Sequence, residues 1–297
     1  MTADPDAPLS PPEPVAAVSS ADAEREVVVA PDDLARIDAL VAELVDGIVR
    51  ADPGSREYLR RIDDLTRIGD REVRATAAMS AQLLVNDLGS NGTVSSCLSE
   101  LRRTIEAVGP ESTKRGSARR AEKAQRRVQE VVAELQDAGA TLNQGNAVVG
   151  QQQRALGTQL HSLRQYACLA ERLDTALQAR IDALAATDPA RAQALRDDAL
   201  WAIRQRHHDL VVHLAVTMQG YSALEVVAAN NRELIRAVRI ATTTTLAALQ
   251  TAVAASSIAD GWHDVLAVLD EVDRYTTLAD RALDLTAANL RDRVANL

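Results

Sequence analysis

Proline is nearly absent from the last two thirds of this chain, and its absence constrains the fold more than any other feature. Pro189 is the only proline after Pro110, so neither the stretch between them nor the whole chain after Pro189 contains one. Because proline breaks helix interiors, such stretches can form very long helices. Apolar residues recur there at heptad-like spacing, as in Val128, Val131, Leu135, Ala138, Leu142 and Val149. This spacing is typical of amphipathic helices and coiled coils.

No segment shows the alternating pattern of a strand. We therefore expect an all-α fold, an elongated bundle of long antiparallel, partly coiled-coil helices. Pro31 and the two aspartates after it open the first helix, and "DPG" at 52–54 ends it. A second helix is predicted from Ser55 to about Leu88, before "GSNG" at 89–92, and a third ends at "GP" at 109–110. The motif "TDP" at 187–189 closes the long helix and caps the next one.

The N-terminal segment up to Ala30 differs in composition from the rest. Six of the nine prolines lie between Pro5 and Pro31, and eight acidic residues accompany one arginine up to Asp33. A segment of this kind buries too little apolar surface to offset its ordering entropy. We predict a disordered acidic, proline-rich tail over residues 1–30 and one helical domain over 31–297.

Charge and cysteine content exclude several classes of protein. A net charge of -9 and an isoelectric point near 5.1 argue against nucleic-acid binding, which needs a basic face. Cys97 and Cys168 lie far apart in the sequence, so they form neither a disulfide framework nor a metal-spaced pair. The start of the chain lacks the basic and apolar regions of a signal peptide, and a cytoplasmic location is expected.

The segment from Ile240 to Ala259 contains no charged residue and raises the question of a membrane span. Eight of its twenty residues are Thr, Ser or Gln, and alanine makes up most of the others. A membrane span normally has leucine, isoleucine, valine or phenylalanine in the lead. We therefore expect a helix enclosed by other helices, in which the threonine hydroxyls donate to carbonyls of the preceding turn.

Few residues suggest chemistry. His207, His208, Asp209 and His213 do not converge on one helix face, so no metal site is expected. No phosphate-binding loop, nucleophile elbow or catalytic carboxylate pair is present, which predicts a protein that is not an enzyme and uses no cofactor.

Two groups of residues are candidates for contacts. Asn231 lies in an apolar stripe beside Asn230, and His207 lies in another, so these three residues are candidates for fixing helix register or contacting a partner. A basic run is a candidate surface for acidic lipid headgroups or an acidic partner, although a solvated helix start explains it as well; it consists of Lys114, Arg115, Arg119, Arg120, Lys123, Arg126 and Arg127.

Three blocks of sequence resemble the toxic-anion-resistance (TelA) family, which is associated with bacterial tellurite resistance. They span residues 58–84, 163–181 and 188–254, and the last contains "RQRHHDL", "QGY", "NNRELI" and "ATTTT" in that order. The resemblance covers nearly all of the chain after Ala30. It implies an all-helical protein, cytoplasmic or peripheral, that acts in resistance to tellurite or similar oxyanions. It supplies no catalytic residues that could be carried over.

Three functions are consistent with the sequence. The leading hypothesis is a non-enzymatic helical scaffold or adaptor whose helical faces bind stress-resistance partners or a second copy. One alternative is a thiol-dependent redox protein that acts on the oxyanion through Cys97 and Cys168. The other is a peripheral membrane protein that binds anionic lipid through the basic run.

Overall fold

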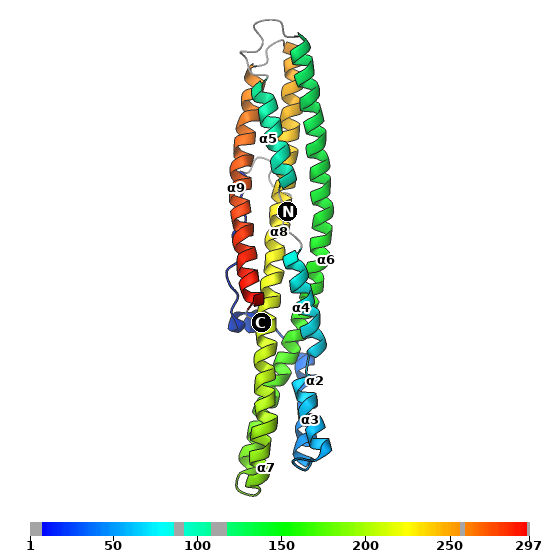
Figure 1. Cartoon of the computed structure of the whole chain (residues 1–297), viewed down its shortest axis with the longest axis vertical. Coiled ribbons are helices and arrows are strands. Elements are labelled where there is room, and N and C mark those ends of the chain that lie inside the picture. The colour runs from blue at the N-terminus through cyan, green and yellow to red at the C-terminus, as the bar shows by residue number, and fades with distance from the viewer. Residues whose placement is uncertain (1–7, 86–91, 108–117, 256–258, 296–297) are drawn as a thin grey trace. The chain divides into compact units, whose positions relative to one another are not determined.

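Long helices dominate the computed structural model, which describes residues 8–85, 92–107, 118–255 and 259–295 (Figure 1). No strand occurs within these ranges, and the all-α prediction is confirmed. The three longest helices are α6 (Ala118–Leu184, 67 residues), α8 (Trp201–Ala255, 55 residues) and α9 (Ala259–Ala295, 37 residues). All three lie in the stretches where proline is nearly absent.

The shorter helices begin where the sequence supplies start signals. They are α2 (Pro31–Arg50), α3 (Arg56–Thr66), α4 (Asp70–Val85), α5 (Gly92–Ala107) and α7 (Pro189–Ala194). The predicted cap at Asp188 is confirmed, since its carboxylate accepts a hydrogen bond from the Arg191 backbone N–H at 3.0 Å. A π-helical segment, Leu195–Leu200, connects α7 to α8.

The prediction of a single helix from Ser55 to about Leu88 is wrong. Its described part forms two helices, α3 and α4, which are separated at Gly69 with a φ of +72°. An added Cβ there would lie 3.0 Å from Cδ2 of Leu210. Glycine is therefore favoured here both by the left-handed backbone and by the lack of space for a side chain. Arg206 stabilises the junction, because it donates to the Ile68 carbonyl at 2.6 Å and to Oδ1 of Asp70 at 2.7 Å.

The chain divides into two compact units. Unit 1 comprises Met1–Val15, Asp87–Gln152 and Ala223–Ala288, and unit 2 comprises Ala16–Asn86, Gln153–Ser222 and Asn289–Leu297. Both α6 and α8 contribute residues to each unit, so neither unit is a single continuous segment.

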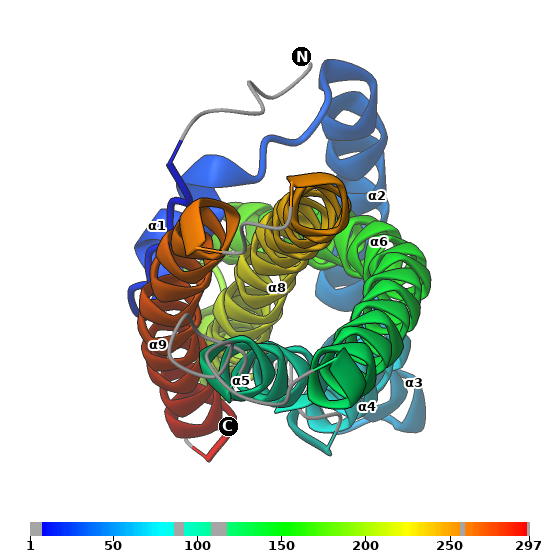
Figure 2. The ribbon, with the colours of Figure 1, turned by 90° about the horizontal axis from the view of Figure 1, so that it is seen from above.

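Unit 1 is built from α5 and α9 with the adjoining parts of α6 and α8, which lie side by side in both views (Figures 1 and 2). Each helix supplies fully buried side chains to one core, including Leu101, Leu135, Leu234 and Val265. At Gly139 an added Cβ would be 3.3 Å from Cγ1 of Val238, so this glycine permits a close approach of α6 and α8.

Unit 2 has its own core, formed by α1 (Ser20–Glu26), α2, α3, α7 and the adjoining parts of α6 and α8. Its fully buried side chains include Ile48, Leu173, Leu177 and Leu210. Tyr58 is also buried, and its hydroxyl donates to the Ala194 carbonyl at 3.1 Å, just before the π-helical segment. Burial raises the pKa of Tyr58, so the hydroxyl stays protonated and remains a donor.

The N-terminal region differs from the disordered tail predicted for residues 1–30. Residues 1–7 lie outside the described residues, but Ser20–Glu26 form helix α1, with Ala23 fully buried in unit 2. The backbone N–H of Val18 donates to Oε1 of Gln219 at 2.8 Å. The disorder prediction considers only the apolar surface that the segment can bury by itself, whereas in the structure the segment packs against other helices of the chain.

The uncharged stretch that starts at Ile240 continues α8, and between 240 and 248 it has one buried face, with Thr243, Leu246 and Ala247 exposed on the other. Thr242 and Thr245 are buried and donate to the Val238 and Ala241 carbonyls at 2.8 and 2.7 Å, which confirms the predicted hydroxyl bonds. Within the described chain, one helical stretch, Pro189–Ala248, is long and apolar enough to cross a membrane by length and composition. Its most apolar window is 72% buried, and core helices pass the same test, so this is weak support for a membrane span.

Candidate functional site

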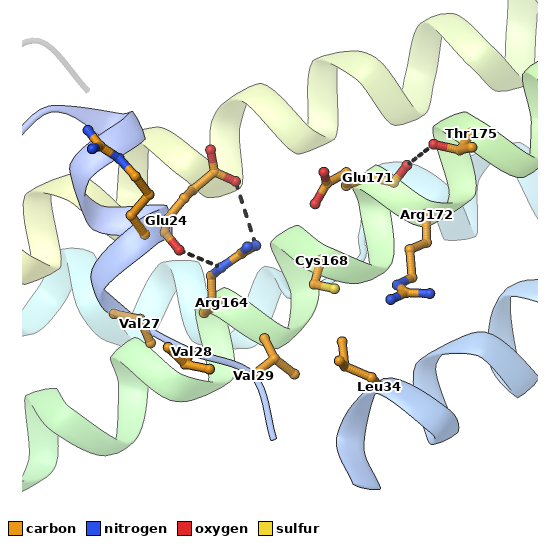
Figure 3. A pocket seen from close by; sticks show the side chains of 11 residues that line it. Glu24, Val27, Val28, Val29, Leu34, Arg164, Cys168, Glu171, Arg172 and Thr175 are labelled. Carbon is orange, nitrogen blue, oxygen red and sulfur yellow. Dashed lines mark hydrogen bonds and ion pairs between the residues drawn. The ribbon is translucent and has the colours of Figure 1, made fainter. Parts of the chain in front are cut away.

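A pocket of about 440 Å³ opens in unit 2 between α6 and the N-terminal segment (Figure 3). Arg164, Cys168 and Arg172 line one wall, because a spacing of four residues places them on the same side of α6. Glu24 of α1 and the segment Val27–Val29 line the other wall. The pocket therefore combines cationic, thiol and apolar groups.

Two of the three arginines at this pocket already have acidic partners. Arg172 pairs with Asp38, and Arg25 pairs with Asp22. The pKa of Arg172 is raised, first by its hydrogen bond with Cys168 and then by the Asp38 carboxylate. These two guanidinium groups are therefore committed to the protein itself.

Arg164 is placed differently. Its Nε donates to the Glu24 carbonyl at 3.2 Å, and its Nη1 lies 3.6 Å from Oε1 of Glu24. Nε2 of His207 lies 3.6 Å from the same carboxylate oxygen. Both nitrogen atoms are buried and have no hydrogen-bond partner in the described part of the chain. Two donors thus converge on one carboxylate without reaching hydrogen-bond distance.

The structure places His207, a candidate from the sequence, beside Glu24 in unit 2, whereas the other two candidates from the apolar stripes lie in unit 1. Asn230 is fully buried, and its Oδ1 accepts a hydrogen bond from the Tyr275 hydroxyl on α9 at 2.9 Å. Oδ1 of Asn231 is buried and has no hydrogen-bond partner among the described residues. Asn230 therefore links α8 to α9 within this chain.

The basic run is only partly described. Lys114 and Arg115 lie outside the described residues, and Arg119 and Arg120 belong to α6 without described side chains. The described members, Lys123, Arg126 and Arg127, are exposed.

Arg127 has acidic neighbours on two helices. It pairs with Glu130 at 3.1 Å and with Glu100 at 3.4 Å, and its hydrogen bond with Glu130 is the main cause of its raised pKa. The carboxylates of Glu100 and Glu130 therefore offset part of the positive charge of the run. Binding of anionic lipid through this surface stays a prediction.

The two cysteines are free thiols in different environments. Cys97 belongs to unit 1, where burial and the neighbouring Glu134 carboxylate raise the pKa of its thiol. A raised pKa makes the reactive thiolate scarce at neutral pH. Cys168 belongs to unit 2 and lies on the pocket wall.

Metal-binding side chains do not gather in the described part of the chain. No group of three or more His, Cys, Asp or Glu side chains there could hold a metal ion.

Sequence reasoning missed Arg164 and Glu24. The spacing of Arg164, Cys168 and Arg172 by four residues was the available signal for this wall of the pocket. The position of Glu24 depends on how the N-terminal segment packs, which composition does not reveal.

Comparison with known proteins identifies the family. The sequence matches the family described as "Toxic anion resistance protein (TelA)" over residues 55–296, which is most of the chain. No curated protein and no solved structure matches it. The match includes the three blocks in which the sequence resembles this family, together with α3 to α9. The chain therefore belongs to the toxic anion resistance (TelA) family.

Proposed function

We propose that this protein acts in the cytoplasm as a non-enzymatic helical adaptor that binds its partners through the outer face of α9. Family membership supports a role in resistance to toxic anions in general. An adaptor would provide resistance through the proteins that it assembles.

The apolar stripes from which partner binding was predicted are largely buried in the cores of the two units. Val128, Leu135, Leu163 and Leu173, for example, are all fully buried. A partner must therefore bind to side chains on the outer surface of the units.

One observation carries the proposal, namely a stripe of exposed residues on α9 within unit 1. Leu278 is 41% exposed and Leu285 is 55% exposed. Arg274 and Arg281 are exposed beside them, and the four residues lie within about 60° of rotation around the helix. Neither arginine forms an ion pair within the described chain. We call these four residues the α9 stripe.

The chemistry of the α9 stripe favours a particular kind of partner. An acidic amphipathic helix could cover the two leucines while its carboxylates pair with Arg274 and Arg281. A second copy that used the same stripe would bring the arginines of both copies together, which is unfavourable. The stripe is therefore better suited to a different acidic protein than to self-association.

Affinity capture from the native host tests this proposal. The full chain, a Leu278→Glu/Leu285→Glu variant and a Val148→Glu control are compared with and without tellurite. Val148 is 53% exposed on α6 of the same unit, so the control adds a carboxylate to another surface. We expect the α9 variant to lose partners that the wild type and the control retain. Equal capture by all three proteins would refute binding through α9, and light scattering would reveal any self-association.

Thiol-dependent chemistry on the oxyanion is a second candidate function. It is favoured by one observation, the position of Cys168 in a pocket with Arg164 and Arg172. Replacing Cys97 and Cys168 with alanine and measuring tellurite resistance in cells tests it. Unaltered resistance would remove this candidate.

A further inference from the structure

We propose that Arg164 and His207 form a binding site for a small oxyanion, and that Glu24 of α1 occupies this site in the free protein. The site lies in unit 2 and is independent of the α9 stripe, so it can exist whether or not the protein is an adaptor.

The donors are the first part of the argument. Nη1 of Arg164 and Nε2 of His207 are both buried without a hydrogen-bond partner in the described structure. Buried polar atoms are normally satisfied, so two unsatisfied atoms directed at one point call for a missing acceptor. An anion beside His207 would accept a hydrogen bond from Nε2 in the tautomer that carries the proton on this atom.

The distances identify what kind of acceptor is missing. Oε1 of Glu24 lies 3.6 Å from each of these two atoms, so the carboxylate balances charge without completing either hydrogen bond. An oxyanion presents several acceptor oxygens on one centre and can accept from a guanidinium and an imidazole together. Glu24 thus resembles a resident substitute for such a ligand.

Glu24 can leave without unfolding the unit. Its side chain is 27% exposed, and it projects from a helix of only seven residues. Rotating the side chain towards solvent would leave intact the hydrogen bond from Nε of Arg164 to the Glu24 backbone carbonyl. The adjoining pocket of about 440 Å³, which Arg164 and Glu24 line, is larger than a small oxyanion, so space for a ligand exists beside Arg164.

Arg164 would lose its acidic neighbour once Glu24 has moved. The lining contains Arg25, Arg164 and Arg172 against Glu24 and Glu171. Arg25 and Arg172 already pair with aspartates, whereas Nη1 of Arg164 is buried and has no hydrogen-bond partner in the described structure. Moving the Glu24 carboxylate away would leave Arg164 without an acidic neighbour at ion-pair distance in the described chain, and an anion could take that place.

Calorimetric titration of the full chain tests this proposal. Sodium tellurite, phosphate and sulfate are the probes, and Cys97 and Cys168 are replaced by serine so that no thiol reaction contributes heat. We expect Glu24→Gln to tighten binding at least tenfold and Arg164→Gln to weaken it at least tenfold. The control is Arg180→Gln, which changes a 52% exposed arginine on α6 outside the pocket and should leave the affinity unchanged.

Two outcomes would overturn the proposal. One is that neither the parent protein nor the Glu24→Gln variant binds any of the three anions at millimolar concentration. The other is that Arg164→Gln binds as tightly as the parent. If Arg164→Gln fails to fold, as judged by far-UV circular dichroism, His207→Gln serves in its place with the same expected loss. A preference among the three anions would show which of them the site selects.

Discussion

Substitution of Gly69 by alanine tests the junction between α3 and α4, where the sequence prediction was wrong. Gly69 has a φ of +72°, and alanine in the left-handed region costs about 1 to 2 kcal/mol. The new methyl group would also lie 3.0 Å from Cδ2 of Leu210 and 3.1 Å from Cγ of Tyr166. Overpacking of this kind costs about 1 to 3 kcal/mol more.

Gly54 provides the matched control. Its φ is +79°, but nothing lies within 4 Å of an added Cβ. The backbone strain and the reduced freedom of the unfolded chain are therefore similar in the two variants and cancel when they are compared. The difference isolates packing, and we expect Gly69→Ala to lower the free energy of unfolding by about 1 to 3 kcal/mol more than Gly54→Ala.

Urea denaturation measures this difference. Both glycines belong to unit 2, and far-UV circular dichroism follows the loss of helix in both variants. The slope of the free energy of unfolding against urea concentration should be the same in both variants, since neither substitution alters the surface that unfolding exposes. Equal destabilisation by the two substitutions would refute the close packing of Tyr166 and Leu210 around the junction. A neutral Gly69→Ala would refute the left-handed turn itself.

Three further predictions concern single groups. Tyr275→Phe should destabilise unit 1 by about 1 to 3 kcal/mol in thermal or urea unfolding, because the buried Asn230 loses a donor, whereas Tyr221→Phe, which breaks no hydrogen bond in the described chain, should be neutral. Burial lowers the pKa of His213 below 6.5, with Arg206 adding to the effect and Asp209 opposing it. The stability that depends on neutral His213 is therefore fully present above pH 6.5 and declines as the pH falls through the folded pKa. A His213→Gln variant whose free energy of unfolding has the same pH dependence as the wild type would contradict this. Cys97 should react with iodoacetamide more slowly than a free thiol at pH 8 and regain the normal rate in urea, as followed by peptide mass spectrometry, because its pKa is raised.

The long helices could be predicted because local signals were sufficient. Proline-free stretches, apolar residues every three or four positions, and caps such as Asp188 are properties of neighbouring residues, and they gave the position of α6 and the start of α7. The break at Gly69 could not be recognised in the same way. One glycine inside a helical pattern is usually tolerated, and the need for a turn arises from Tyr166 and Leu210, which are distant in the sequence.

The candidate site was predicted only in part, for a similar reason. His207 was selected for its place in an apolar stripe, but its partner Glu24 lies in a segment whose composition indicates disorder. Burial of Ala23 fixes the position of α1 and brings Glu24 to Arg164. Contacts between segments so far apart follow from tertiary packing, which no local pattern in a single sequence records.

The central claim is that this protein confers resistance by what α9 binds. Tellurite resistance of host cells that carry the Leu278→Glu/Leu285→Glu chain as their only copy tests it most directly, with equal expression confirmed. The account predicts that these cells become sensitive while cells with Val148→Glu stay resistant. Wild-type resistance in cells whose α9 variant no longer captures partners would contradict it.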